Sequence, residues 1–191
     1  MGQGNAQHHA GDTGGEREIM TCIGIDPAYA KPVTLAWLES GKRHRDALAK
    51  FDRHSRWHRA EANPANGNFT TLLGQILSEA KEYHGATRVC LEDGFIGVNP
   101  KVGMRLAEIR GVIKTVATMQ GLECRLVAPA TWQAACLSLG GVRPQRHREI
   151  ALAAILRAKH VTGMDLGEDM ACAVCLAEWG NAHPEVWDDE K

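Results

Sequence analysis

The segment MTCIGIDPAYA, residues 20–30, is an apolar run that stops abruptly at an acid, Asp26. The run predicts a buried β-strand, and the Pro and Ala that follow predict that the chain leaves the sheet there. An acid at the end of a buried strand gains nothing from the core, yet it is held rigidly and still faces water. We therefore expect Asp26 to be a functional residue with partners on other elements.

The composition bounds the class of protein. The chain has 191 residues, 44% of them hydrophobic and 24% charged, and a formal net charge of −1. These values predict one globular domain with a sizeable core, and they exclude a whole-molecule attraction to nucleic acid. Because no apolar run approaches roughly 18 residues and no basic-then-apolar leader is present, we expect neither a membrane span nor a secretory signal, and a cytoplasmic location.

The pattern of strands and helices predicts the fold. A second strand, VTLAWLE at 33–39, follows the first through a short connection, so the two should pair antiparallel. A third strand is expected from the basic stretch at 42–59, and TRVCLED (87–93) and LECRLVAP (122–129) then alternate with helices. We predict an α/β fold with a mixed five-stranded sheet flanked by helices on both faces. The expected domain is 19–182, with a disordered arm at 1–18 and an acidic tail at 183–191.

The strand predicted at 87–93 also has an acid, Glu92, where its apolar run stops. Functional groups gather at the carboxyl ends of strands in open α/β sheets, so Glu92 and Asp26 should lie close together if their strands are neighbours. Two carboxylates so close repel unless a cation separates them, and Mg²⁺ accepts such oxygen ligands. A third acid should come from the last helix, which begins with Glu168 and Asp169, although acids there also complement the helix dipole whatever the function.

Other features of the chain allow two readings. The basic stretch KRHRDALAKFDRHSRWHR (42–59) is either a solvated face or a surface that contacts phosphates. The six cysteines lie mostly in apolar runs at irregular spacing, which predicts reduced, buried thiols. CAVC at 172–175 has metal-ligand spacing, but no second ligand pair follows it, so a zinc site is not expected.

Four segments in order carry a family resemblance: IGIDPA, VCLEDGFIGVNPKVGMRLAEIRGVIKTVA, RLVAPATWQ and EDMACAVCLA. Together, from about residue 20 to 180, they resemble the RuvC-type Holliday junction resolvases of the RNase H-like superfamily. The resemblance implies an RNase H-like sheet and an endonuclease that cleaves four-way DNA junctions by metal-assisted phosphodiester hydrolysis. It also implies a homodimer with one site on each protomer, for which the long helix at 99–121 would suit the interface.

The resemblance assigns roles to particular residues. It implies two Mg²⁺ ions, for which Mn²⁺ can substitute, held by Asp26, Glu92 and Asp169, with Glu168 as a further catalytic acid. Arg146, before the penultimate helix, would stabilise charge in the transition state, although that loop could equally be a solvated one. Phe95 would contact bases at the branch point, unless it is a core aromatic. The remaining expected DNA contacts are Asn99, Lys101, Arg105, Arg143, Arg146, Arg148, Arg53 and Arg56.

The sequence departs from the family pattern at one position. The last helix should carry two acids three residues apart, and here Asp169 is followed by Cys172. A thiolate is a poor partner for Mg²⁺. Either Asp169 and Glu168 suffice, or the second metal binds weakly, or catalysis is reduced. Two alternatives therefore stay open: a junction-binding protein with little or no cleavage, and an RNase H-like nuclease that acts on another DNA structure or hybrid. A small-molecule enzyme that uses the CAVC thiols is a more distant third.

Overall fold

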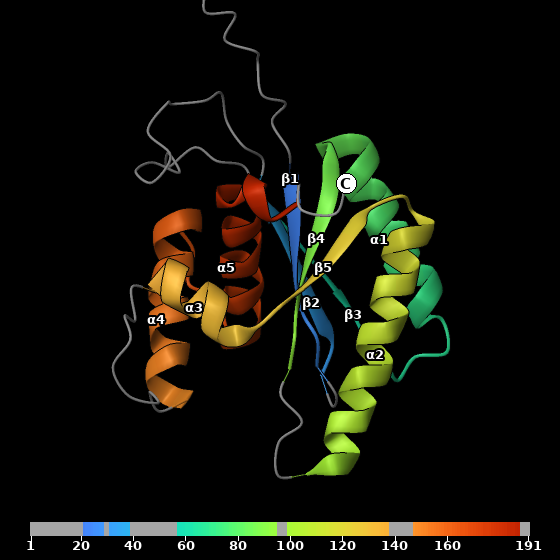
Figure 1. Ribbon diagram of the computed structural model, residues 1–191, viewed down its shortest axis with the longest axis horizontal. Helices are drawn as coiled ribbons and strands as arrows, with labels where there is room; N and C mark the ends of the chain where they lie inside the picture. Colours follow the sequence, from blue (N-terminus) through green and yellow to red (C-terminus); the bar gives the residue numbers. More distant parts are fainter. Residues whose placement is uncertain (1–20, 29–30, 39–56, 95–98, 138–146, 188–191) are drawn as a thin grey trace, which may run out of the picture.

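The computed structural model describes residues 21–28, 31–38, 57–94, 99–137 and 147–187. Its centre is a five-stranded sheet with the strand order β3-β2-β1-β4-β5 (Figure 1). Strand β1 pairs antiparallel with β2 and parallel with β4, and the outer pairs are antiparallel β2/β3 and parallel β4/β5. The strands are β1 (Thr21–Asp26), β2 (Val33–Leu38), β3 (Trp57–Ala62), β4 (Ala86–Glu92) and β5 (Glu123–Val127).

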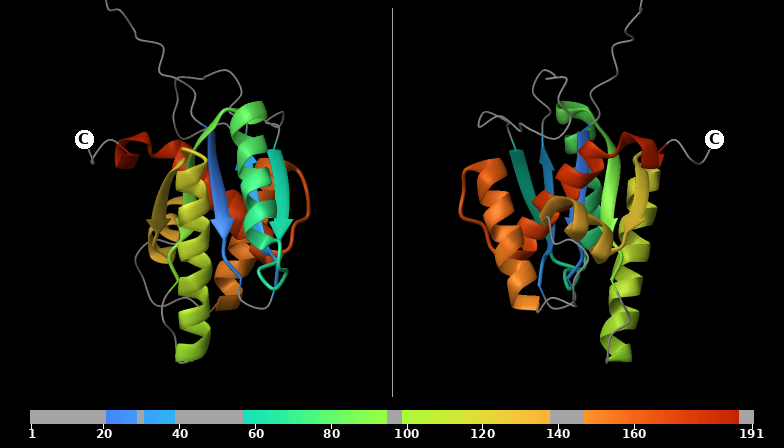
Figure 2. Two further views of the ribbon diagram at one scale, coloured as in Figure 1. Left: turned by 90° about the vertical axis from the view of Figure 1, so that its right-hand side faces the viewer. Right: turned by 60° about the vertical axis from the view of Figure 1, so that its left-hand side comes forward.

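Helices cover both faces of this sheet (Figures 1 and 2). One face packs against the first two helices and the other against the last three, so the molecule has three layers. The helices are α1 (Phe69–His84), α2 (Pro100–Met119), α3 (Pro129–Leu137), α4 (His147–Thr162) and α5 (Glu168–Ala182), and a short 3₁₀ helix, η1 (Pro184–Trp187), ends the described chain. The predicted mixed sheet between two helical layers is present.

The alternation of side chains along the strands divides the core in two. Ile23 and Ile25 of β1 point to the α1/α2 face, whereas Cys22 points to the α3/α4/α5 face. On β4, Val89 and Leu91 likewise belong to the first face. The even-numbered positions of β1 and β4 therefore face α5, and this parity decides where the last residue of each strand points.

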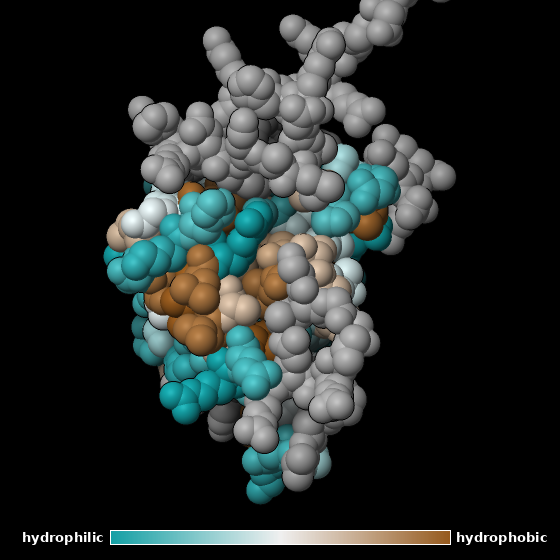
Figure 3. Space-filling view, turned by 90° about the vertical axis from the view of Figure 1, so that its left-hand side faces the viewer, coloured by the Kyte–Doolittle hydropathy of each residue, from teal (hydrophilic) through white to brown (hydrophobic). Residues whose placement is uncertain are grey.

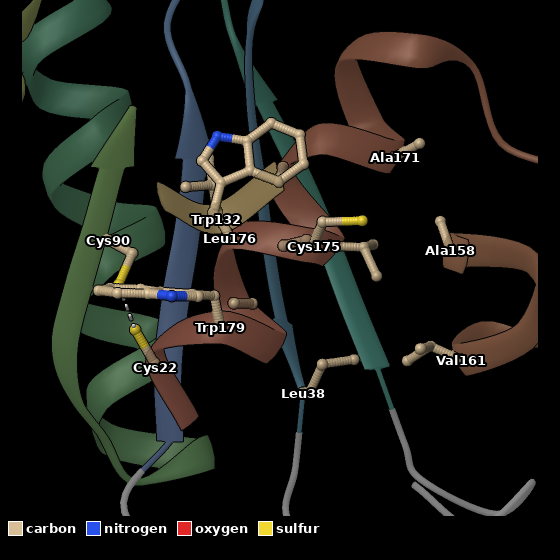
Figure 4. Close-up of a cluster of buried hydrophobic side chains, with 14 of the residues drawn as sticks. Cys22, Leu38, Cys90, Trp132, Ala158, Val161, Ala171, Cys175, Leu176 and Trp179 are labelled. Atoms are coloured by element: carbon tan, nitrogen blue, oxygen red, sulfur yellow. Dashed lines mark hydrogen bonds between the residues drawn. The ribbon is translucent and has the colours of Figure 1, made fainter. Parts of the chain in front are cut away.

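Helix α5 approaches the sheet unusually closely because small residues meet at the contact. A Cβ atom on Gly24 would collide with the backbone of Ala173 and Ala177, and one on Gly180 would collide with the thiols of Cys22 and Cys90. These two cysteines lie on neighbouring strands with their sulfur atoms 3.4 Å apart (Figure 4). Tight packing of this kind fixes the height and rotation of α5 on β1.

The helix caps follow local sequence signals. The Asn99 side chain accepts a hydrogen bond from the Lys101 backbone N–H (3.1 Å), and Pro100 stands at the first helical position of α2. Gly85 ends α1 with a positive φ of 64°. These caps fix where α1 ends and where α2 begins.

Two details differ from the sequence expectations. The described part of the third strand runs from Trp57 to Ala62, so it includes the last three residues of the basic stretch and continues beyond it. The acidic tail was expected from residue 183, but η1 covers 184–187 and the side chain of Trp187 is buried. Trp187 also stacks under the guanidinium group of Arg88, 5.0 Å from the ring centre. The described part of the expected tail thus packs against the sheet through Trp187.

The outer helical layer carries an apolar patch (Figure 3). Leu152 and Leu156 lie one turn apart on α4, and their side chains are 57% and 59% exposed.

None of the helices in the described ranges is long and apolar enough to cross a membrane.

Candidate active site

Asp26 and Glu92 end two neighbouring parallel strands. Ile25 lies opposite Leu91 in the register, so the two acids that follow stand side by side at the same edge of the sheet. Both occupy even positions, and both side chains therefore point to the α5 face, where their carboxyl groups share a hydrogen bond. The structure thus confirms that these two predicted residues come together, at the lower end of the sheet in Figure 1.

Burial and mutual repulsion change the protonation of this pair. Burial, followed by the charge of Glu92 and the hydrogen bond to it, raises the pKa of Asp26 from 3.8 to about 9. Burial also raises the pKa of Glu92, against the opposing effects of its hydrogen bonds and of the nearby Arg110 charge. Without a cation the two carboxyl groups share a proton, because two adjacent negative charges repel in a partly buried site. A divalent ion would take the place of that proton.

Buried side chains from two helices lie near Glu92, and one of them, Trp132, donates a hydrogen bond to it. Trp132 of α3, fully buried, directs its indole N–H at the Glu92 Oε1 atom at 3.4 Å. Arg110 of α2 is also buried, and its guanidinium group lies where a Cβ atom on Gly94 would stand. A Cβ atom at position 94 would collide with the Arg110 Nη1 atom, so a larger residue there would require the arginine side chain to shift. Sequence reasoning identified neither residue as functional, because each is a buried side chain on a different helix.

The first turn of α5 lies beside the pair. The negative charges of Asp169 and Glu168 both contribute to the raised pKa of Asp26, which shows that both acids are close to it. Asp169, however, is ion-paired with Lys31, whose Nζ atom lies 3.0 Å from Oδ2. Glu168 lies 3.3 Å from the Nε2 atom of His147. Asp169 and Glu168 are thus near the pair, as predicted, but each carboxylate has a cationic or titratable partner of its own.

Cys172 faces the same site from the next turn of α5. Burial raises the pKa of its thiol, and the charges of Asp26, Glu92 and Glu168 raise it further, so Cys172 is a neutral thiol close to the carboxylates. It thus stands near the position at which a second acid of the helix was expected. The side chain contributes sulfur and no negative charge to the site.

The donor atoms fit one hard divalent cation. Two carboxylates in contact at the surface end of a sheet are the protein ligands that Mg²⁺ typically uses, with waters completing its shell. Within the described ranges, no three His, Cys, Asp or Glu side chains are already arranged around a common metal position. Asp26 and Glu92 are the adjacent pair that could hold such an ion, and the roles of Asp26, Glu92 and Asp169 as metal ligands remain predictions.

A polar cavity of about 210 Å³ adjoins the site on the side of β2 and β3. Arg59 and Glu61 of β3 line one wall, and the loop before α5 with its first turn lines another. The Thr34 hydroxyl, also in the lining, donates to the Asp169 backbone carbonyl at 3.1 Å and fixes the start of α5 over the sheet. Arg59 belongs to the basic stretch singled out in the sequence.

The predicted DNA-contact residues divide into three groups. Lys101 and Arg148 are exposed near the helix starts, as a phosphate contact requires, and Arg105 is exposed but ion-paired with Glu108 at 2.8 Å. Asn99 has a structural role as the cap of α2. The remaining predicted contacts lie outside the described residues: Arg53, Arg56, Phe95, Arg143 and Arg146.

Lys31 is a further residue of the site that sequence reasoning missed. It lies in the turn between β1 and β2, five residues after Asp26, and its side chain is 66% exposed. The hydrogen bond and the charge of Asp169 raise its pKa. The sequence showed only that a lysine follows the strand-terminal acid in the connection between two strands. Such lysines are too common to identify a site residue.

The sequence of the chain is similar to that of a known protein. No protein-family model matches the chain. The chain is 26% identical over 113 residues to the crossover junction endodeoxyribonuclease RuvC of Chlorobium phaeobacteroides. That match covers 57% of this chain and 60% of the relative, so the chain spans less than two thirds of that protein.

Solved structures match over a larger part of the chain. Thermus thermophilus RuvC in complex with a Holliday junction substrate superposes with a TM-score of 0.62 at 15% identity, over 88% of this chain and 96% of that one. The fowlpox virus resolvase in complex with Holliday junction DNA gives 0.52 at 11% identity, over 87% and 99%. At such identities the superpositions establish the fold, and the predicted fold class is confirmed. The chain has the mixed α/β fold of the RuvC-type Holliday junction resolvases, and the family resemblance read from its sequence is confirmed.

Proposed function

We propose that this protein is a divalent-metal-dependent endodeoxyribonuclease that cleaves four-way DNA junctions. The observation that carries the proposal is the hydrogen-bonded pair of partly buried carboxyl groups, Asp26 and Glu92, at the carboxyl edge of a RuvC-like sheet. Buried acids held in contact lower stability, so their placement is explained best by a function that needs them.

The residues of the site have separate tasks. Asp26 and Glu92 bind the cation, while the Trp132 indole N–H holds Glu92 in position. A cation bound there supplies an activated water and neutralises charge on the phosphate. Asp169 and Glu168 add negative potential next to the pair, which increases the affinity of the site for divalent ions. Mg²⁺ is the proposed ion, with Mn²⁺ as a substitute, because both accept carboxylate oxygens. The expected second ion depends on whether Asp169 is available as a ligand.

A branched substrate is supported by the surroundings of the site and by its relatives. The exposed side chains of Lys101, Arg105 and Arg148, with Arg59 at the cavity, offer phosphate contacts on several sides of the carboxylates. Phe95 is proposed as the residue that stacks on an unpaired base, and Arg146 as a further phosphate contact. The T. thermophilus and fowlpox virus neighbours are complexes with Holliday junction DNA.

We further propose a homodimer, because a symmetric junction offers two equivalent strands to cut. The outward face of α2 is the candidate interface. Met104, Val112 and Met119 are 65%, 36% and 78% exposed, and their spacing of seven or eight residues places them along one side of the helix. We also propose a disordered arm at 1–18 and a cytoplasmic location.

A second candidate function is junction binding with weak cleavage. The specific observation in its favour is Cys172, a neutral thiol where the resemblance predicts an acid. The two candidates differ in turnover and share the binding surface.

The test is cleavage of three labelled substrates of matched sequence: a synthetic four-way junction, a linear duplex and an RNA–DNA hybrid. The proposal predicts Mg²⁺-dependent cuts in the junction at a rate at least about 100-fold above the duplex. Binding without cuts would favour the second candidate, whereas equal cutting of hybrid or duplex would favour another nuclease of the same fold.

A further inference from the structure

The turn between β1 and β2 places a positive charge at the acids of the site. The Lys31 Nζ atom lies 3.0 Å and 3.4 Å from the two carboxylate oxygens of Asp169, so the ammonium group is centred on that carboxylate. Asp169 is itself fixed, because its backbone carbonyl accepts the hydroxyl of Thr34 at 3.1 Å. The Lys31 side chain is 66% exposed, so its ammonium group is accessible from solvent.

The ligands that a second divalent ion would need are missing on the same side. Cys172 offers a thiol one turn after Asp169, and a thiol is a poor ligand for Mg²⁺. Glu168 lies against His147 at the start of α4 and does not replace it. Beside Asp169 the strongest available cation is therefore the ammonium group that already lies there.

We propose that Lys31 takes the place of a second metal ion, so that this protein works with one divalent cation per active site. The inference rests on the proposed function, because it concerns the same site. The three candidate ligands, Asp26, Glu92 and Asp169, carry three negative charges when all are ionised, and Lys31 returns one positive charge; Glu168, which lies 3.3 Å from His147, is not counted as a ligand. The remaining double negative charge is balanced by one divalent cation. A site with an acid in place of Cys172 and without Lys31 would carry four negative charges, twice the net charge of the present site, and would suit two divalent cations.

The chemistry of Lys31 follows from its charge. In phosphodiester hydrolysis the water oxygen forms a bond to phosphorus, the bond from phosphorus to the leaving oxygen breaks, and that oxygen keeps the electron pair. Lys31 donates hydrogen bonds to the negative charge that builds on the phosphate and stays protonated throughout. The proton lost by water and the proton gained by the leaving oxygen are both exchanged with solvent.

The first measurement counts bound ions without using activity. Mn²⁺ is titrated into the DNA-free protein by calorimetry, and free Mn²⁺ is counted by electron paramagnetic resonance. We expect one Mn²⁺ per protomer for the wild type and for Lys31→Met, and two for the double variant Lys31→Met, Cys172→Asp. The matched control is Lys159→Met, which removes a lysine from another surface pair, 2.7 Å from Asp165, and should bind one ion.

The second measurement is cleavage of the four-way junction at saturating Mg²⁺. Lys31→Met should lower the rate about 100-fold, as expected for loss of a charged donor to the transition state. Lys31→Arg should keep the rate within about 10-fold of the wild type, and the double variant should recover at least about 10-fold over Lys31→Met by taking up a second ion. Lys159→Met should cleave like the wild type. Circular dichroism of each variant checks that the fold is kept.

The outcomes separate this inference from the proposed function. Two Mn²⁺ ions in the wild type, or full cleavage by Lys31→Met, would overturn the role of Lys31 and leave the nuclease assignment intact. A wild type that binds no Mn²⁺ and cuts no junction would overturn the proposed function itself. One ion in the wild type, two in the double variant and a slow Lys31→Met would support both.

Discussion

At the scale of single residues, the site is dominated by the cost of holding Asp26 next to Glu92. The pKa of Asp26 in the folded protein is raised to about 9 from 3.8, so the metal-free fold retains a proton that the unfolded chain releases. The stability of the metal-free fold that depends on protonated Asp26 is fully present below about pH 3.8 and is lost as the pH rises towards 9. A bound cation removes the cost by neutralising the pair.

We therefore predict that Asp26→Asn is more stable than the wild type in a metal chelator, and that its advantage grows between pH 5 and pH 9. At pH 8 the difference in the free energy of unfolding should exceed about 1.4 kcal/mol, the equivalent of one pKa unit. Urea unfolding at a series of pH values measures it. Glu79→Gln, at an exposed acid of α1, is the control and should follow the wild type. A constant difference across this pH range would show that Asp26 is ionised in the fold.

Residue-level sequence reasoning found the groups whose signal is local. Asp26 and Glu92 each end an apolar run, and an acid there has no other explanation, so their convergence could be predicted. Lys31, Arg110 and Trp132 could not be predicted as site residues. Their roles arise because a turn, α2 and α3 are brought to one sheet edge by tertiary packing.

At the scale of elements, the contact between α5 and β1 positions the acids of the helix over those of the strands. A methyl group at Gly24 would collide with the α5 backbone at Ala173 and Ala177, and backbone cannot move aside as a flexible side chain can. We predict that Gly24→Ala lowers the free energy of unfolding by more than about 3 kcal/mol and also lowers Mn²⁺ affinity, because α5 must shift.

The matched control is Gly74→Ala on α1, where the added methyl would meet only side chains at 3.6 Å and 3.7 Å. That substitution should raise stability by up to about 1 kcal/mol through helix propensity. Denaturant unfolding of both variants measures the contrast. If Gly24→Ala were as stable as Gly74→Ala, the close approach of α5 would not exist.

The order of the elements was predictable, and some of their boundaries were not. Strands β1 and β2 are mostly apolar runs, and Asn99 and Pro100 are local signals for the start of α2. The position of β3 was less clear because WHRAEA has few apolar residues and is held by pairing with β2. The burial of Trp187 depends on stacking with arginines from β4 and β5, which no local pattern shows.

At the scale of the whole molecule, two exposed apolar faces compete as the interface between protomers. Met104, Val112 and Met119 lie on α2, while Leu152 and Leu156 lie on α4. The long α2 face is the proposed one. We predict that Val112→Glu weakens dimerisation at least about 10-fold, since it places a charge in a desolvated contact, whereas Leu156→Glu leaves it unchanged.

Analytical ultracentrifugation over a range of protein concentrations measures both variants. Both substitutions are on exposed side chains, so the fold of the protomer should be kept. Loss of association in Leu156→Glu alone would move the interface to α4. A wild type that stays monomeric at all concentrations would contradict the proposed dimer.

If acids from β1 and β4 hold a metal ion for junction cleavage, wild type and Asp26→Asn should differ on a synthetic four-way junction with Mg²⁺. Binding and cleavage are measured on the same samples. We expect the variant to bind the junction as tightly as the wild type or more tightly and to cleave it at least about 1,000-fold more slowly. Cleavage by Asp26→Asn at the wild-type rate would contradict this role of the acids.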